Sequence, residues 1–204
     1  MEQIEQLPYF NKISAGVALG KSGQNLDYWI KTRLKTGEII SLKKGLFVSR
    51  IYLSAENEKQ KYYESIANII RYPSYLSLEY VMALWGLIPE SVFAFTSITL
   101  KSSRSYSNKL GNFIYKNIKE VLFIGFKIIE YGNKKISIAT KAKALFDFLY
   151  LKIFVSRQRM KTEVLEELRI NWNEFDKDDI QEFKNYVKLS KSSKMKRVVK
   201  ILKW

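Results

Sequence analysis

Residues 24–35 read Gln-Asn-Leu-Asp-Tyr-Trp-Ile-Lys-Thr-Arg-Leu-Lys, and this stretch has the pattern of an amphipathic helix. At about 100° per residue, the apolar side chains gather on one arc, and the long side chain of Arg33 lies at the edge of that arc. The opposite arc is polar and basic, and its members are Gln24, Tyr28, Lys31, Thr32 and Lys35. The pattern predicts a helix that is anchored on one side and free on the other.

The flanking residues predict a second helix before this one and a hairpin after it. Residues 11–19 read as a short helix that ends in a glycine turn, and Gly37 follows the second helix as a C-terminal cap. Residues 39–42 and 46–48 are β-prone runs around a Lys-Lys-Gly turn, which is a hairpin pattern. The apolar candidates of the first helix are Ile13, Val17 and Leu19.

This order of elements predicts a winged helix-turn-helix over residues 1–52, with the second helix in the major groove and the hairpin as the wing. Gln pairs with adenine, Lys with guanine or phosphate, and Thr and Tyr contact bases or phosphate. The predicted DNA-binding residues are Gln24, Tyr28, Lys31, Thr32, Lys35, Lys43 and Lys44. The alternative is an ordinary surface helix with a solvated lysine face.

Composition narrows the class of protein. The 204-residue chain has a formal net charge of +15 and contains no Cys and no His. A basic excess of this size favours nucleic acid as a partner, although a lysine-rich solvated surface has the same composition. Without Cys or His, the chain cannot form a disulfide, a Ser-His-Asp triad or a His-ligated zinc site. We therefore expect no enzyme and no cofactor, while carboxylate-only magnesium chemistry stays open.

The sequence has no apolar run of the length of a signal peptide or a membrane span. We therefore expect a soluble cytoplasmic protein that has no membrane partner.

Residues 53–204 predict a larger mixed α/β domain with a helical C-terminus, so the expected fold class is α+β. Helices are predicted over residues 57–71, 77–85, 140–152, 159–169, 178–189 and 194–203. Strands are predicted over residues 92–100, 113–118, 122–131 and 135–138.

Two groups of residues in this domain invite a functional interpretation. Ser77 is a predicted helix N-cap, and Asp147, inside an apolar helix, is predicted to make structural hydrogen bonds. The aromatic residues are predicted to be core, with a stacking platform for single-stranded nucleic acid as the alternative. These aromatic residues are Tyr62, Tyr63, Tyr72, Tyr75, Tyr80 and Trp85.

Residues 188–203 are basic and amphipathic, with an apolar stripe formed by Met195, Val198, Val199 and Leu202. This segment could dock on the body and widen a DNA footprint, pack as a solvated helix without a partner, or contact an acidic protein or a membrane surface. Its predicted basic surface consists of Lys191, Lys194, Lys196, Arg197 and Lys200.

Four stretches, at residues 35–48, 73–89, 95–99 and 138–151, occur in an order that resembles the AbiEi-type antitoxin family, whose members are transcriptional regulators of viral defence systems. The two more specific stretches are PSYLSLEYVMALWGLIP at 73–89 and IATKAKALFDFLYL at 138–151. The resemblance covers about residues 10–152. Lys141-Ala142 stands where the family pattern has Pro-Glu, which removes a carboxylate from the start of a helix.

The resemblance implies the antitoxin of a type IV toxin–antitoxin system for phage defence. The winged domain would bind double-stranded DNA at repeats in its own promoter and repress it, and the larger domain would counter a cognate nucleotidyltransferase-like toxin. Three alternatives stay open: a protein-interaction module, an orphan winged-helix regulator without a toxin, and a magnesium-dependent nucleic-acid enzyme.

Overall fold

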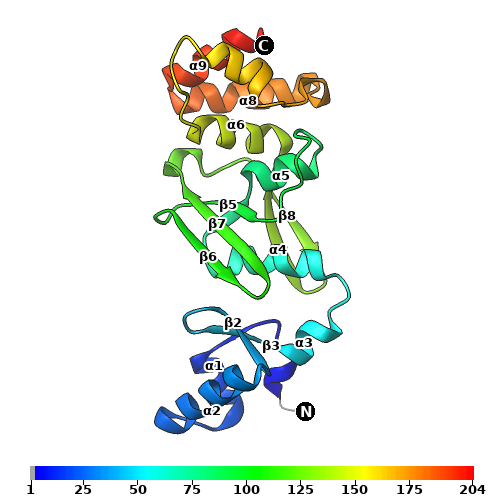
Figure 1. Cartoon of the computed structure of the whole chain (residues 1–204), viewed down its shortest axis with the longest axis vertical. Coiled ribbons are helices and arrows are strands. Elements are labelled where there is room, and N and C mark those ends of the chain that lie inside the picture. The colour runs from blue at the N-terminus through cyan, green and yellow to red at the C-terminus, as the bar shows by residue number, and fades with distance from the viewer. Residues whose placement is uncertain (1–2) are drawn as a thin grey trace.

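The computed structural model describes residues 3–204 as a mixed α+β protein with two sheets. A small N-terminal unit, a central body and a layer of C-terminal helices follow one another along the long axis (Figure 1). The helices are α1 (Lys12–Leu19), α2 (Gly23–Thr36), α3 (Arg50–Ala55), α4 (Lys59–Ile70), α5 (Leu78–Leu84), α6 (Lys141–Leu151), α7 (Met160–Thr162), α8 (Lys177–Ser190) and α9 (Ser193–Leu202). Shorter helical turns are η1 (Gln3–Gln6), η2 (Glu120–Leu122), η3 (Glu163–Glu167) and η4 (Trp172–Glu174). The strands are β1 (Phe10–Asn11), β2 (Ile39–Lys43), β3 (Leu46–Ser49), β4 (Ser74–Leu76), β5 (Phe95–Thr99), β6 (Arg104–Asn108), β7 (Gly111–Asn117), β8 (Phe126–Tyr131) and β9 (Lys134–Ala139).

The N-terminal unit contains the predicted helix, turn, helix and hairpin. The side chain of Asn11 accepts a hydrogen bond from the Ser14 amide at 2.9 Å, and Ser14 Oγ accepts one from the Asn11 amide, so a capping box starts α1. Gly37 has a φ of 76° and ends α2 in the left-handed conformation that the sequence predicts. Strands β1, β3 and β2 form a three-stranded antiparallel sheet beside these helices.

Two of the apolar candidates of α1, Ile13 and Val17, do not pack in the core, because they are 78% and 81% exposed. Helices α1 and α2 approach too closely for large side chains at their contact. A Cβ atom on Gly16 would lie 3.0 Å from the Lys21 carbonyl oxygen. The fully buried Ala15 therefore supplies the inward contact of α1.

The β2–β3 hairpin has both faces buried. Ile39 and Phe47 pack with the α1 and α2 side chains, whereas Ile40 and Leu42 pack in the core of the body. Asn108 Nδ2 donates a hydrogen bond to the Leu42 carbonyl at 2.9 Å across this junction. Two hydrophobic cores thus share one hairpin, although the predicted boundary after residue 52 assigns it to the N-terminal domain alone.

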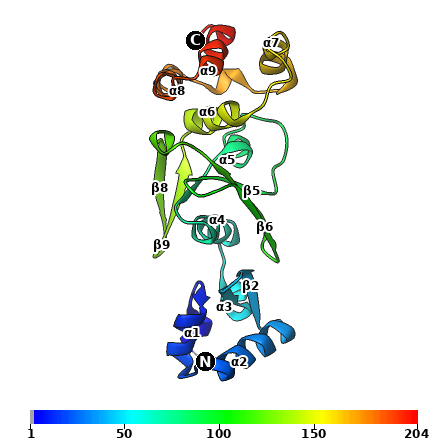
Figure 2. The ribbon, with the colours of Figure 1, turned by 90° about the vertical axis from the view of Figure 1, so that its left-hand side faces the viewer.

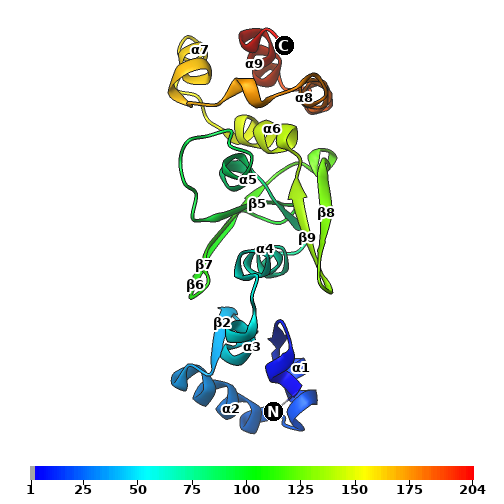
Figure 3. The ribbon, with the colours of Figure 1, turned by 90° about the vertical axis from the view of Figure 1, so that its right-hand side faces the viewer.

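The body contains a six-stranded mixed sheet in the order β6-β7-β5-β4-β9-β8. Helix α4 lies on the side of the N-terminal unit, and α5 and α6 lie on the opposite side (Figures 2 and 3). The predicted strand over residues 122–131 is shorter than expected, because η2 and Gly125, with a φ of 76°, precede β8.

The C-terminal helices cover the end of the body away from α2 (Figure 1). Met195 and Val198 of α9 are fully buried against the body, and the Trp204 ring packs among Trp172, Phe175 and Phe183. The helix predicted over residues 159–169 is α7 continued by the wider turn η3. Over residues 3–204, no helix combines the length and apolar character needed to cross a membrane.

Candidate nucleic-acid interface

Helix α2 has a buried face and an outward face, as its sequence predicts. Leu26 and Ile30 are buried in the small core. Trp29 is half-buried, and the Arg33 guanidinium lies 5.1 Å from its ring centroid, at the edge of the apolar arc. The five predicted groove-facing residues are all exposed: Gln24, Tyr28, Lys31, Thr32 and Lys35.

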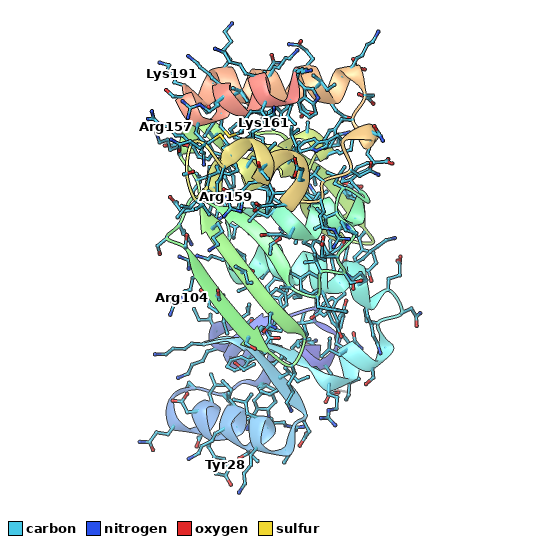
Figure 4. All side chains as sticks on the ribbon, turned by 45° about the horizontal axis from the view of Figure 1, so that its top comes forward. Tyr28, Arg104, Arg157, Arg159, Lys161 and Lys191 are labelled. Atoms are coloured by element: carbon cyan, nitrogen blue, oxygen red, sulfur yellow. The ribbon has the colours of Figure 1, made fainter. Side chains whose placement is uncertain are left out.

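This outward face lies at one extremity of the molecule. Tyr28 is 72% exposed and marks the end of the structure opposite Lys191 (Figure 4). Nothing in the described part of the chain covers it, so the surface is open to a partner.

Two carboxylates near α2, those of Asp27 and Glu38, are paired with cations. Lys12 Nζ lies 2.5 Å from Asp27 Oδ1, and Glu38 forms an ion pair with Arg33. A hydrogen bond from Thr36 and the charge of Arg33 hold the pKa of Glu38 below its ordinary value. Because these acids are already neutralised, the positive charge of the helix is left to attract an external anion.

The predicted phosphate contact of Lys43 is not supported by its position. The half-buried Lys43 donates a hydrogen bond from Nζ to the Ile70 carbonyl at 2.6 Å. Ile70 is the last residue of α4, where carbonyl groups lack helical partners, so Lys43 serves as a cap for that helix. Lys44, in the turn, remains exposed.

Only part of the predicted C-terminal basic surface is exposed in the structure. Lys191, Lys196 and Lys200 are exposed, and Arg197 is half-buried. Lys194 points inward, because its Nζ donates to the carbonyls of Tyr150 and Lys152 at 2.5 and 2.8 Å.

These two carbonyls belong to the end of α6, and burial lowers the pKa of Lys194. The apolar stripe of α9 packs against the body, which removes the surface that a membrane contact through this helix would need.

A buried ion pair holds the centre of the body together. Lys143 Nζ lies 2.6 Å from Asp147 Oδ1, and neither side chain is exposed. Asp147 Oδ2 accepts hydrogen bonds from Ser77 Oγ at 2.8 Å and from the Tyr75 hydroxyl at 3.0 Å. Burial lowers the pKa of Lys143 and raises the pKa of Asp147, while their mutual attraction opposes both shifts.

The predicted structural role of Asp147 is therefore confirmed. Ser77 stands at the N-cap position of α5, but its side chain makes no capping hydrogen bond and binds Asp147 instead. Lys141, at the departure from the family pattern, contacts Asp179 Oδ2 at 2.5 Å and so connects α6 to α8.

The predicted aromatic residues form no shared platform. Tyr62, Tyr75 and Tyr80 are buried, and Tyr63 is half-buried. The exposed members, Tyr72 and Trp85, belong to separate surroundings: Tyr72 lies beside Phe123 and Phe126, and Trp85 lies beside Lys141. The prediction that these aromatic residues belong to the core is confirmed for most of them.

Residues 3–204 contain no cluster of three or more carboxylates that could hold a metal ion. No family model matches the chain, and no curated protein matches it either. The resemblance to AbiEi-type antitoxins therefore stays a prediction.

Proposed function

We propose that this protein is a transcriptional regulator that binds double-stranded DNA through α2. The order helix, turn, helix and hairpin, with the sheet order β1-β3-β2, supports the winged helix-turn-helix that this function needs. The observation that carries the proposal is the outward face of α2, where Lys31 and Lys35 are exposed and Asp27 and Glu38 are paired with cations. In this function α2 enters the major groove, and Gln24 and Thr32 read base edges.

The contacts to the DNA backbone differ from those that the sequence predicts. Lys44 is available for a phosphate, whereas Lys43 is used inside the molecule. The 14-residue helix α2 has no acidic residue in its first turn, so its amide groups suit a phosphate oxygen.

The experiment is a salt titration of duplex binding with the Lys31→Ala/Lys35→Ala double variant. The probe is a 30-base-pair duplex from upstream of the protein's own gene, and a mixed-sequence duplex serves as a comparison. Each lost phosphate contact lowers the slope of log affinity against log salt concentration by about 0.9, so we expect weaker binding and a slope reduced by about two.

The matched control is Lys116→Ala/Lys119→Ala, which removes the same charge from exposed positions on the body. If the α2 variant keeps the affinity and salt slope of the unchanged protein, α2 does not contact the duplex.

We further propose that the DNA is the protein's own promoter and that the body counters a nucleotidyltransferase-like toxin. The resemblance to AbiEi-type antitoxins supports this, and exposed apolar side chains at Phe93, Ile153 and Val155 favour a protein contact on the body. Co-expression with a nucleotidyltransferase-like neighbouring gene tests it: growth should be restored by the protein and not by a Phe93→Asp/Ile153→Asp variant. Equal rescue by that variant removes these two side chains from the function, and no rescue at all contradicts the antitoxin proposal.

A further inference from the structure

A groove of about 550 Å³ lies between the β8–β9 hairpin and the end of α4. Pro8 and Tyr9, which precede α1, close one side of it. This volume falls in the range of roughly 300–1,000 Å³ that is typical of small-molecule sites. The groove is separate from the outward face of α2, so its chemistry is independent of DNA binding.

Aromatic rings form one end of the groove. Phe123 and Phe126 line it, and Phe126 stacks on the buried Tyr75 ring with the centroids 4.7 Å apart. Tyr72 stands at the rim with 74% of its surface exposed, and Tyr9 is also exposed. Exposed rings beside a supported aromatic wall are suited to stack on a planar ligand.

The other end of the groove carries two lysine side chains. Its lining contains Lys134 and Lys135 and no carboxylate. Lys134 is already used, because it contacts Glu56 and lies 4.7 Å from the Tyr131 ring centroid. Lys135 is exposed and forms no ion pair or hydrogen bond within residues 3–204, and Glu130 lies opposite it in the β8–β9 register.

The strand register places the two ends on one face of the hairpin. Phe126 pairs with Ala139, Ile128 with Ser137 and Glu130 with Lys135, so Phe126, Ile128, Glu130 and Lys135 point to the same side. Ala139, which lies opposite Phe126, is four residues from Lys135 along β9, and this corresponds to about 13 Å. With the length of a lysine side chain, the ring wall and the ammonium group can bind opposite ends of one ligand.

We propose that this groove binds a nucleotide, with the base against Tyr72 and Phe126 and the phosphate at Lys135. A free mononucleotide and the phosphorylated end of a nucleic-acid strand share this chemistry. Both would bridge the body and the residues that lead into α1.

The test is calorimetric titration of the full chain with AMP, with adenosine and inorganic phosphate as separate titrants. We expect saturable AMP binding, with adenosine at least tenfold weaker. Tyr72→Ala should weaken AMP binding about tenfold or more, because it removes a stacking ring. Lys135→Gln should abolish the preference for AMP over adenosine.

The matched control is Lys127→Gln, on the other face of β8, which should bind AMP as the unchanged protein does. Ile128→Glu is a second blocking variant, because it places a carboxylate in the groove at an exposed position. A 5′-phosphorylated tetranucleotide that binds more than tenfold tighter than AMP identifies a strand end as the ligand, and equal affinity identifies the free nucleotide.

The proposal is overturned if AMP does not bind, or if it binds equally to the Tyr72→Ala, Lys135→Gln and Ile128→Glu variants. The Lys31→Ala/Lys35→Ala variant should bind AMP normally, so failure of the DNA-binding proposal and failure of this one give different results.

Discussion

Gly16 sets how closely the first two helices approach. A Cβ atom there would lie 3.0 Å from the Lys21 carbonyl oxygen and 3.3 Å from the Leu26 side chain. The oxygen belongs to the turn between α1 and α2, so it cannot move without moving the start of α2. The position of the proposed reading helix thus depends on the absence of one methyl group.

We expect Gly16→Ala to destabilise the protein, although alanine ordinarily favours a helix by about 1 kcal/mol over glycine. Overpacking costs about 1–3 kcal/mol, so it should outweigh the helix preference. Denaturant unfolding measures the free energy, and Val17→Ala, at an exposed position of α1, should change it by less than about 0.5 kcal/mol. A Gly16→Ala variant as stable as the unchanged protein would show that the turn can yield.

The buried pair of Lys143 and Asp147 gives a second prediction at this scale. Lys143→Met leaves the Asp147 carboxylate without its cation in the core, and such a loss costs about 3–5 kcal/mol. The double variant Lys143→Met/Asp147→Leu should be more stable than Lys143→Met, because it removes the unpaired charge as well. Chemical denaturation compares the two, and a double variant of lower stability contradicts the expectation.

At the scale of elements, the sequence predicts those with a clear period. Helices α1, α2, α6 and α8 and strands β5, β7 and β9 occur where apolar spacing and turn residues place them. The three-residue strand β4 and the strand β6, which alternates serine with other polar residues, carry no apolar pattern. The sequence also does not predict helix α3, because α3 starts directly after β3 without a linker.

The part of the candidate interface on α2 was predictable because it follows the period of a single helix. The outward arc of α2 is a local property, since one helical period determines it. The true partners of Lys43 and Lys194 are backbone carbonyls 27 and at least 42 residues away in the chain. A sequence does not display such contacts, so both residues look like free cations.

The hairpin turn offers a prediction that separates folding from binding. Lys43→Ala should lower thermal stability and leave duplex affinity almost unchanged, because Lys43 caps α4. Lys44→Ala should leave thermal stability almost unchanged and weaken duplex binding, because Lys44 is exposed and available to phosphate. Melting curves and duplex titrations of both variants give the comparison, and similar effects of the two changes would contradict it.

At the scale of the whole molecule, the shared hairpin couples the two units. The Tyr62 hydroxyl also donates to the Pro8 carbonyl at 2.6 Å, which adds a contact between the body and the residues before α1. We therefore expect the full chain to unfold in one cooperative transition.

A fragment of residues 53–204 should melt at a lower temperature and bind a hydrophobic dye, because it lacks the hairpin side chains of its core. Calorimetry of the full chain and of the fragment checks this. An equally stable fragment would mean that the body is complete without the hairpin.

Under the proposed function, the two-sided hairpin also limits how the protein can acquire a new DNA target. Exchanging the entire N-terminal segment with that of another regulator would bring foreign side chains against Tyr62 and its neighbours, so the graft would have to match the recipient. Changes confined to the outward positions of α2 meet no such constraint. Under that function, target preference can diversify at the tip of the protein while its interior stays the same.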